Sequence, residues 1–289
     1  MPNHLSPTKT QVCLQERTVD FQFNDVPCIW LADTIKTHFM HSLSLFIPTS
    51  ERAVIEILRK QLKQTNAPET QHLIHALIKQ EGQHAAMHRR ANRRILTQHP
   101  ELKWIDSLHN FFMKWVRKFS SHGFELAIPV GFEHITAATS KHVLTHKNDW
   151  FKKHSNNQAT DFLLWHCLEE LEHQAVCLSI YRTVYPNTTL NNWRIILSLF
   201  LVWLPVTCFS VFTIQFYLLL KDKTLLSLGN WPKFLMFMGR TTGLFYKGLF
   251  TYRKNKHSAW SQKDITLYKT TCDEFNQRQA TNSQLKTPS

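Results

Sequence analysis

Two copies of a Glu-x-x-His repeat constrain this chain more than any other feature of its sequence. The first is "EGQH", Glu81 to His84, and the second is "ELEH", Glu170 to His173. This spacing places both side chains of a repeat on one face of a helix. One such repeat is usually a solvated helix face, whereas two on separate helices are much rarer by chance. In four-helix proteins that bind two metal ions through carboxylates, each repeat is joined by a single Glu from another helix.

The pattern of hydrophobic residues predicts an all-α protein. Only 7 glycines occur in 289 residues, and period-two alternation is nowhere sustained, so we expect no sheet. An amphipathic helix over about 98–121 should connect two helical hairpins, with the aromatic residues of 104–115 in the core. The hairpin helices are expected over about 33–63, with an interruption at Pro48, and over about 69–96, 124–146 and 157–184. The predicted fold is a four-helix bundle of two hairpins joined by a crossover helix.

Two single glutamates lie where these hairpins bring them level with the repeats. Glu51 lies about as far before the end of the first helix as Glu81 lies after the start of the second. In the second hairpin, Glu133 lies at the corresponding depth opposite Glu170. The predicted metal ligands are therefore Glu51, Glu81, His84, Glu133, Glu170 and His173.

Three other glutamates compete with these ligands. Glu169 lies beside Glu170 on the same face as the second histidine, and Glu172 lies one position before that histidine. The Glu-x-x-His spacing favours Glu170 over both. Glu56 competes with Glu51, but it points elsewhere on its helix and is expected in solvent.

The ligand types indicate which metal ions the site would prefer. Carboxylates and imidazoles without cysteine favour iron or manganese over a structural zinc, so we expect two divalent ions, iron with manganese as the alternative. His88, His134 and His166 are expected beside the ligands, where an imidazole could orient a ligand or move a proton. The 6 cysteines show no paired short spacing, which argues against a zinc ribbon or a disulfide framework.

The C-terminal third combines an apolar run with most of the basic excess of the chain. Residues 195–220 contain no charged side chain and are long enough for a tilted transmembrane helix. A kink or re-entrant hairpin at Pro205, an interfacial helix, and burial in a soluble core are the alternatives. Three basic residues interrupt the apolar stretch 231–250, which favours an interfacial helix there.

The charge distribution indicates the class of partner. The net charge is +13, and from residue 189 onward thirteen Lys and Arg residues face four Asp and Glu residues. Basic residues beside apolar surface suit an anionic membrane through 195–250, and no motif for nucleic acid is present. Without an apolar run at its start, the chain is expected to lack a signal peptide and to lie at the cytoplasmic side of the inner membrane. We expect three regions: an irregular segment 1–32, the bundle 33–188, and a membrane-associating region 189–289.

The segments that carry the predicted ligands resemble a known family. "FIPTSER", "KQEGQHAAMHRRAN", "FEHITAA" and "WHCLEELEHQAV" resemble successive blocks of a bacterial family of predicted metal-dependent hydrolases, of ferritin-like type. The apolar stretch after Arg194 and the basic tail "YRKNKHSAWSQKD" extend the resemblance over roughly residues 20–265. The resemblance implies a ferritin-like bundle, and it implies metal binding by the same six ligands.

Three functions fit this sequence. A dinuclear site can activate water for hydrolysis, as the resemblance implies, or it can activate dioxygen if the metal is iron. The third is a membrane-attached bundle that binds metal without catalysis. The expected substrate is a small molecule, and the apolar C-terminal segment suggests an apolar one. A homodimer is left open.

Overall fold

The computed structural model describes residues 14–284 except residues 25, 153–156 and 255–259. Within these described residues the chain forms helices and irregular segments and no strand, so the all-α prediction is confirmed. The α-helices are α1 (Thr34–Leu62), α2 (Pro68–Gln98), α3 (Trp104–Phe119), α4 (His122–Thr145), α5 (Lys147–Trp150), α6 (Gln158–Val184), α7 (Thr189–Ser198), α8 (Phe212–Lys221), α9 (Trp231–Lys254) and α10 (Gln262–Gln284).

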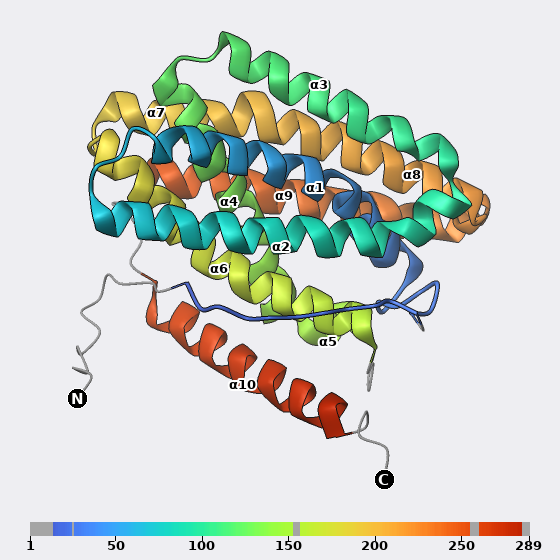
Figure 1. The fold of residues 1–289 in the computed structure, drawn as a ribbon. Helices are drawn as coiled ribbons and strands as arrows, with labels where there is room; N and C mark the ends of the chain where they lie inside the picture. The colour runs from blue at the N-terminus through green and yellow to red at the C-terminus, as the bar shows by residue number, and fades with distance from the viewer. Residues whose placement is uncertain (1–13, 25, 153–156, 255–259, 285–289) are drawn as a thin grey trace.

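Four long helices surround the centre of the molecule. Helix α1 packs against α2, α4 packs against α6, and further contacts join α2 to α6 and α1 to α4. Helix α3 connects the two pairs and contacts α1 from outside (Figure 1). These helix positions lie within a few residues of those predicted. The N-terminal segment and α10 lie below this group in the figure, on the side away from α3.

Helix starts are fixed by local side-chain chemistry. Asp33 accepts a hydrogen bond from the amide of Lys36 at the start of α1, and Asn157 caps α6 in the same way through the amide of Thr160. Helix α2 begins at Pro68, whose missing N–H costs nothing in the first turn. These caps satisfy amide groups that would otherwise lack partners.

Pro48 does not interrupt α1, contrary to the prediction. Proline cannot donate to the carbonyl four residues earlier, which leaves the Ser44 carbonyl without its helical partner. The side-chain amide of Asn92 on α2 donates to that carbonyl at 2.7 Å. The helix continues through Pro48 because a neighbouring helix supplies the missing hydrogen bond.

Three aromatic residues of α3 lie on the surface, so the expectation that they belong to the core is wrong. Trp104, Phe111 and Trp115 are 60%, 67% and 54% exposed. The opposite face of α3 is the buried one, through Ile105 and Met113. Helix α3 thus carries apolar residues both on its inner face and on its surface.

The apolar stretch forms one continuous helix from Thr189 to Lys221, without a hairpin at Pro205. By length and composition this helix could cross a membrane, but 41% of its most apolar window is buried inside the protein. Pro205 lies between two π-helical turns, Leu199–Trp203 and Val206–Val211. The wider backbone spacing of such turns accommodates a residue that cannot donate a backbone hydrogen bond.

A glycine lets this apolar helix approach α4 closely. A Cβ atom on Gly131 would lie 2.7 Å from Oγ of Ser198 and 3.0 Å from Cδ1 of Trp203. Both side chains donate to α4: Ser198 to the carbonyl of Ala127 at 3.0 Å, and Trp203 to that of Ile128 at 2.9 Å. The apolar helix is therefore attached to the backbone of α4 immediately before the predicted ligand Glu133.

Candidate metal centre

The six predicted metal ligands converge at the centre of the four long helices. Each is completely buried, with 0% of its surface exposed. Helix α1 contributes Glu51, α2 contributes Glu81 and His84, α4 contributes Glu133, and α6 contributes Glu170 and His173.

Two groups of side chains could each hold a metal ion. One group is Glu51, His84, His166 and Glu170, and the other is Glu81, His84, Glu170 and His173. Within each group, one ligand atom per residue lies within 4.8 Å of all the others. Because both groups contain His84 and Glu170, they are adjacent halves of one cluster.

The distances place Glu170 between the two predicted histidine ligands. Its Oε1 lies 3.3 Å from Nδ1 of His84 and 3.8 Å from Nδ1 of His173. Glu51 approaches Nδ1 of His84 at 3.7 Å, and Glu81 and Glu133 approach Nδ1 of His173 at 2.8 and 3.5 Å. In both imidazoles, Nδ1 is therefore the ring nitrogen that faces carboxylates from more than one helix.

The atoms that face the centre of the cluster contact one another and have no hydrogen-bond partner outside the cluster among the described residues. The buried atoms without such a partner are Nδ1 of His84, Nδ1 of His173, and both carboxylate oxygens of Glu51, Glu81, Glu133 and Glu170. Buried polar atoms are normally hydrogen-bonded, because leaving them unpaired costs free energy. Four buried carboxylates with two inward imidazole nitrogens fit divalent metal ions, which supply the missing positive charge.

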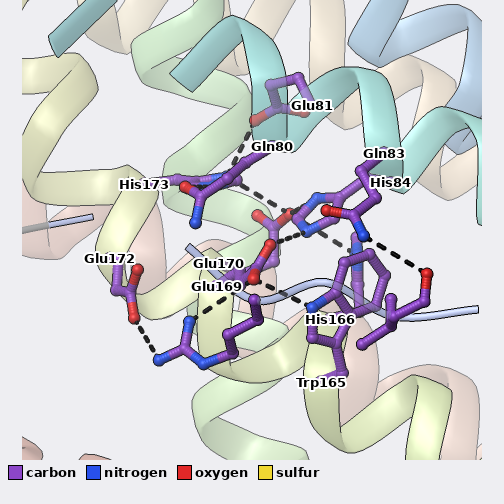
Figure 2. Close-up of polar contacts among 12 residues, drawn as sticks. Gln80, Glu81, Gln83, His84, Trp165, His166, Glu169, Glu170, Glu172 and His173 are labelled. Atoms are coloured by element: carbon purple, nitrogen blue, oxygen red, sulfur yellow. Dashed lines mark hydrogen bonds and ion pairs between the residues drawn. The ribbon is translucent and has the colours of Figure 1, made fainter. Parts of the chain in front are cut away.

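The outer nitrogens of both imidazoles are held by other side chains (Figure 2). Nε2 of His84 lies 2.9 Å from Oε2 of Glu169, and Nε2 of His173 lies 3.1 Å from Oε1 of Gln80. Trp165 donates to the other oxygen of Glu169 at 2.9 Å. Partners of this kind fix which ring nitrogen keeps its lone pair for a metal. Here they leave Nδ1 of each ring available to the cluster.

The protonation of the carboxylates reflects their crowding. Burial and the charges of Glu81 and Glu170 raise the pKa of Glu51 and of Glu133 well above the ordinary value. Glu170 differs: although burial favours its neutral form, the imidazoles of His166 and His84 lower its pKa. Without a metal ion, the cluster therefore retains protons on some of its acids.

The two histidines that are predicted ligands also have raised pKa values. Burial opposes a charge on His84, but its contacts with Glu169 and Glu170 raise its pKa to about 9. For His173, Glu81 and Glu133 likewise outweigh burial and raise the pKa well above its ordinary value. Protons on these side chains thus balance the negative charge of the carboxylates. A metal ion would take over this role, and its binding would release the protons.

The structure places the three accompanying histidines differently from one another. His166 belongs to a group that could hold a metal, with Nε2 at 3.5 Å from Glu170, so its position is more central than predicted. His88 lies against His166, with ring centroids 4.7 Å apart. His134 is buried on α4, and its Nδ1 lies 2.7 Å from the side-chain amide of Gln174.

The competing glutamates are engaged outside the two metal-binding groups. Glu169 holds His84, as described above, and Glu172 accepts hydrogen bonds from Arg17 at 2.7 Å and from the hydroxyl of Tyr268 at 2.6 Å. Glu56 belongs to neither group; its side chain is 41% exposed and pairs with Arg117. Both groups that could hold a metal contain Glu170, and neither contains Glu169.

Comparison with known proteins now gives the family. The family model described as predicted metal-dependent hydrolase matches residues 15–263. The chain belongs to this family. The match covers the six predicted ligands and the apolar helix, and part of the tail that it covers, residues 255–259, lies outside the described residues. No curated protein and no solved structure matches the chain. For this predicted metal-dependent hydrolase, a buried Glu and His cluster that could bind metal agrees with the family description.

Proposed function

We propose that this protein is a dinuclear metal-dependent hydrolase built on a ferritin-like four-helix bundle. The observation that carries the proposal is the set of inward atoms of Glu51, Glu81, Glu133, Glu170, His84 and His173, all buried and without a hydrogen-bond partner outside the cluster among the described residues. Two single glutamates and two Glu-x-x-His repeats on four helices form the ligand pattern of di-metal carboxylate bundles. Iron is the proposed metal and manganese the alternative, because the ligands are oxygen and imidazole nitrogen without sulfur.

The chain's own residues would hold the two ions as follows. Glu51 with His84 would hold one ion, and Glu81 and Glu133 with His173 would hold the other, as their distances suggest. Glu170 lies between the two imidazoles and belongs to both groups, so it would help to hold either ion. When bound, such ions lower the pKa of a coordinated water and polarise a carbonyl or phosphoryl oxygen.

His166 is the proposed proton acceptor for that water. Its Nε2 faces Glu170 at 3.5 Å, whereas its buried Nδ1 has no hydrogen-bond partner among the described residues. Burial and the neighbouring His84 lower the pKa of His166 to about 3, so the ring is neutral and one of its nitrogens keeps a lone pair. A neutral imidazole beside a water is a common general base.

Oxygen activation is the second candidate function. It is favoured by the number of carboxylates in the cluster, which resembles oxygen-activating iron bundles by fold analogy. Two measurements on one preparation of anaerobic ferrous protein distinguish these functions. Oxygen consumption is measured with an oxygen electrode, and hydrolysis is measured with a panel of ester and phosphoester substrates. Turnover of an ester or phosphoester without oxygen consumption supports the hydrolase. Stoichiometric oxygen consumption without hydrolysis supports the oxidoreductase, and bound metal with neither activity supports the non-catalytic bundle.

A further inference from the structure

A cavity of about 340 Å³ borders the metal cluster on one side. Its volume lies at the small end of the range for small-molecule sites. Its apolar lining includes Met40, Ile47, Ile95, Val143, Phe162 and Leu163. His166, which belongs to one metal-binding group, also lines the cavity and connects the two sites.

His88 supplies a polar atom to this apolar cavity. The residue is 4% exposed, it lines the cavity, and its Nε2 has no hydrogen-bond partner among the described residues. Its other ring nitrogen, Nδ1, lies 2.8 Å from the hydroxyl of Ser44. An imidazole buried in this way keeps a strong hydrogen-bonding atom that no part of the described chain uses.

The hydrogen bonds around Ser44 determine which nitrogen of His88 carries the proton. The Asn92 amide donates to the Ser44 carbonyl that Pro48 leaves free, so the oxygen of the same amide is turned toward the Ser44 hydroxyl. That hydroxyl donates to the amide oxygen at 2.7 Å and must therefore accept from Nδ1 of His88. Nε2 of His88 is left with its lone pair and acts as a hydrogen-bond acceptor.

We propose that this cavity binds the substrate, and that the substrate is a small, mainly aliphatic or aromatic ester whose free hydroxyl group donates to Nε2 of His88. The inference rests on the function proposed above and adds the class of substrate to it. The lining is mainly apolar, although Arg94, Lys221 and Asp222 also border the cavity, and it favours a mainly apolar molecule. The fixed acceptor at Nε2 of His88 favours a molecule with a donor over an isomer that has none.

Calorimetry with two isomeric ligands tests the proposal on the full-length protein, with metal content measured on the same samples. Octan-1-ol carries the donor, and 1-methoxyheptane has the same atoms without it. We expect the alcohol to bind roughly five-fold more tightly, the value of one net hydrogen bond. The His88→Leu variant should lose this preference. The His109→Leu variant should keep it, because His109 is also buried but does not line the cavity.

The outcomes separate this inference from the proposed function. Failure of both ligands to bind, or an unchanged preference in His88→Leu, would overturn the substrate class whatever the metal content. Absence of metal would overturn the proposed function even if the alcohol binds. If His88→Leu does not fold, the ¹⁵N spectrum of histidine-labelled wild-type protein decides. A ring nitrogen of the unprotonated type should shift with the alcohol and not with the ether, and no shift would contradict the proposal.

A second surface of the molecule carries an independent inference. The outer face of α3 has an unbroken apolar stripe of Trp104, Leu108, Phe111, Trp115 and Phe119, each 54–69% exposed. Exposed lysines border this stripe on one side at positions 103, 114 and 118, and Nζ of Lys118 lies 5.7 Å from the centre of the Phe119 ring. The one acid within α3, Asp106, is engaged by the hydroxyl of Thr49.

We propose that α3 lies in the plane of an anionic membrane surface, with its aromatic stripe inserted among the lipids. Tryptophan and phenylalanine beside lysine are the composition of helices that bind the lipid interface. The apolar helix from Thr189 to Lys221 adds further exposed side chains, among them Phe200 and Phe209 at 52% and 75%. In Figure 1 both helices lie in the upper part of the molecule, away from α10.

Sedimentation with lipid vesicles tests this surface on the full-length protein. Binding should be strong to vesicles that contain phosphatidylglycerol and at least five-fold weaker to pure phosphatidylcholine, because the lysines contribute about 1 kcal/mol each. The double variant Phe111→Ser with Trp115→Ser should lose most of the binding. The control Leu228→Ser, at an 84% exposed residue outside α3, should not.

Two results would overturn the proposal. Undiminished binding of the folded double variant would assign the membrane contact to the Thr189–Lys221 helix. Dimers of the wild type that become monomers in the double variant, without vesicle binding by either, would assign the stripe to a second copy of the chain.

Discussion

Oε2 of Glu169 lies 2.9 Å from Nε2 of His84, on the side of the ring that faces away from the metal cluster. Glu169 is completely buried, and its other oxygen accepts from Trp165 at 2.9 Å. The carboxylate is therefore fixed by the tryptophan and in turn orients the histidine. A residue that competes with Glu170 in the sequence has a different task in the structure: it directs Nδ1 of His84 toward the other buried carboxylates of the cluster.

The Glu169→Gln variant should keep its fold and bind metal about 10- to 100-fold more weakly, as is typical when the partner of a ligating histidine is lost. Metal titration against a chelator of known affinity measures the change. Glu172→Gln is the matched control, because Glu172 is equally buried on the same helix but contacts Arg17 and Tyr268. Equal losses in both variants would show that Glu169 does not act through His84.

Removal of the metal should make stability dependent on pH. The pKa of His84 is raised to about 9 in the folded metal-free protein, above its unfolded value of about 6.5. The contribution of His84 to the free energy of unfolding is fully present below about pH 6.5 and is lost as the pH rises through about 9. The raised pKa values of Glu51 and Glu133 act in the same direction, since their contribution is present below about pH 4.5.

The melting temperature of the chelator-treated protein should therefore fall between pH 6 and pH 9.5. The metal-loaded protein should not show this fall, because the ion takes the place of the protons and binds better as they leave. Differential scanning calorimetry of both forms provides the measurement. A metal-free protein that becomes more stable toward pH 9.5 would contradict the protonation of the cluster described above.

His166→Ala should distinguish a proton acceptor from a metal ligand. Because His84 and Glu170 also serve the half of the cluster that contains His166, the variant should keep its metal content. Its turnover should fall by roughly 100-fold or more, the contribution of a general base. Metal analysis and hydrolysis assays on one preparation measure both quantities. Loss of one ion per chain would make His166 a ligand instead.

Gly131→Ala should lower the free energy of unfolding by about 1–3 kcal/mol, because the added methyl group would overlap Ser198 and Trp203. Urea denaturation measures this loss. Gly82→Ala is the control. Its Cβ would meet nothing within 4 Å, so the free energy of unfolding should rise by about 0.5–1 kcal/mol. A neutral Gly131→Ala variant would mean that the apolar helix is not packed on α4 as described.

The sequence allowed the helices and the six converging residues to be predicted because both follow from local spacing. Helix periodicity places Glu81 with His84 and Glu170 with His173, and hairpin geometry brings Glu51 and Glu133 to the same depth. The outer contacts of the cluster have no such signal. Gln80 belongs to α2 and holds a histidine of α6, so only the packing of the two helices brings them together.

Helix α3 shows why its aromatic residues were assigned to the wrong environment. Apolar residues occur on both of its faces, with Ile105 and Met113 on one and Trp104 and Phe111 on the other. Periodicity predicts that such a helix has an apolar face, but it does not decide which of two apolar faces packs on the protein. The choice depends on α1, against which α3 packs.

The metal content of the anaerobically purified, full-length protein tests the central claim most directly. Elemental analysis should find about two iron or manganese ions per chain, as expected for a dinuclear carboxylate site. Glu81→Ala and Glu170→Ala should each reduce this content, whereas Glu172→Ala should leave it unchanged. A folded wild-type protein without stoichiometric metal, or an equal loss from Glu172→Ala, would contradict the assignment of this cluster as a metal centre.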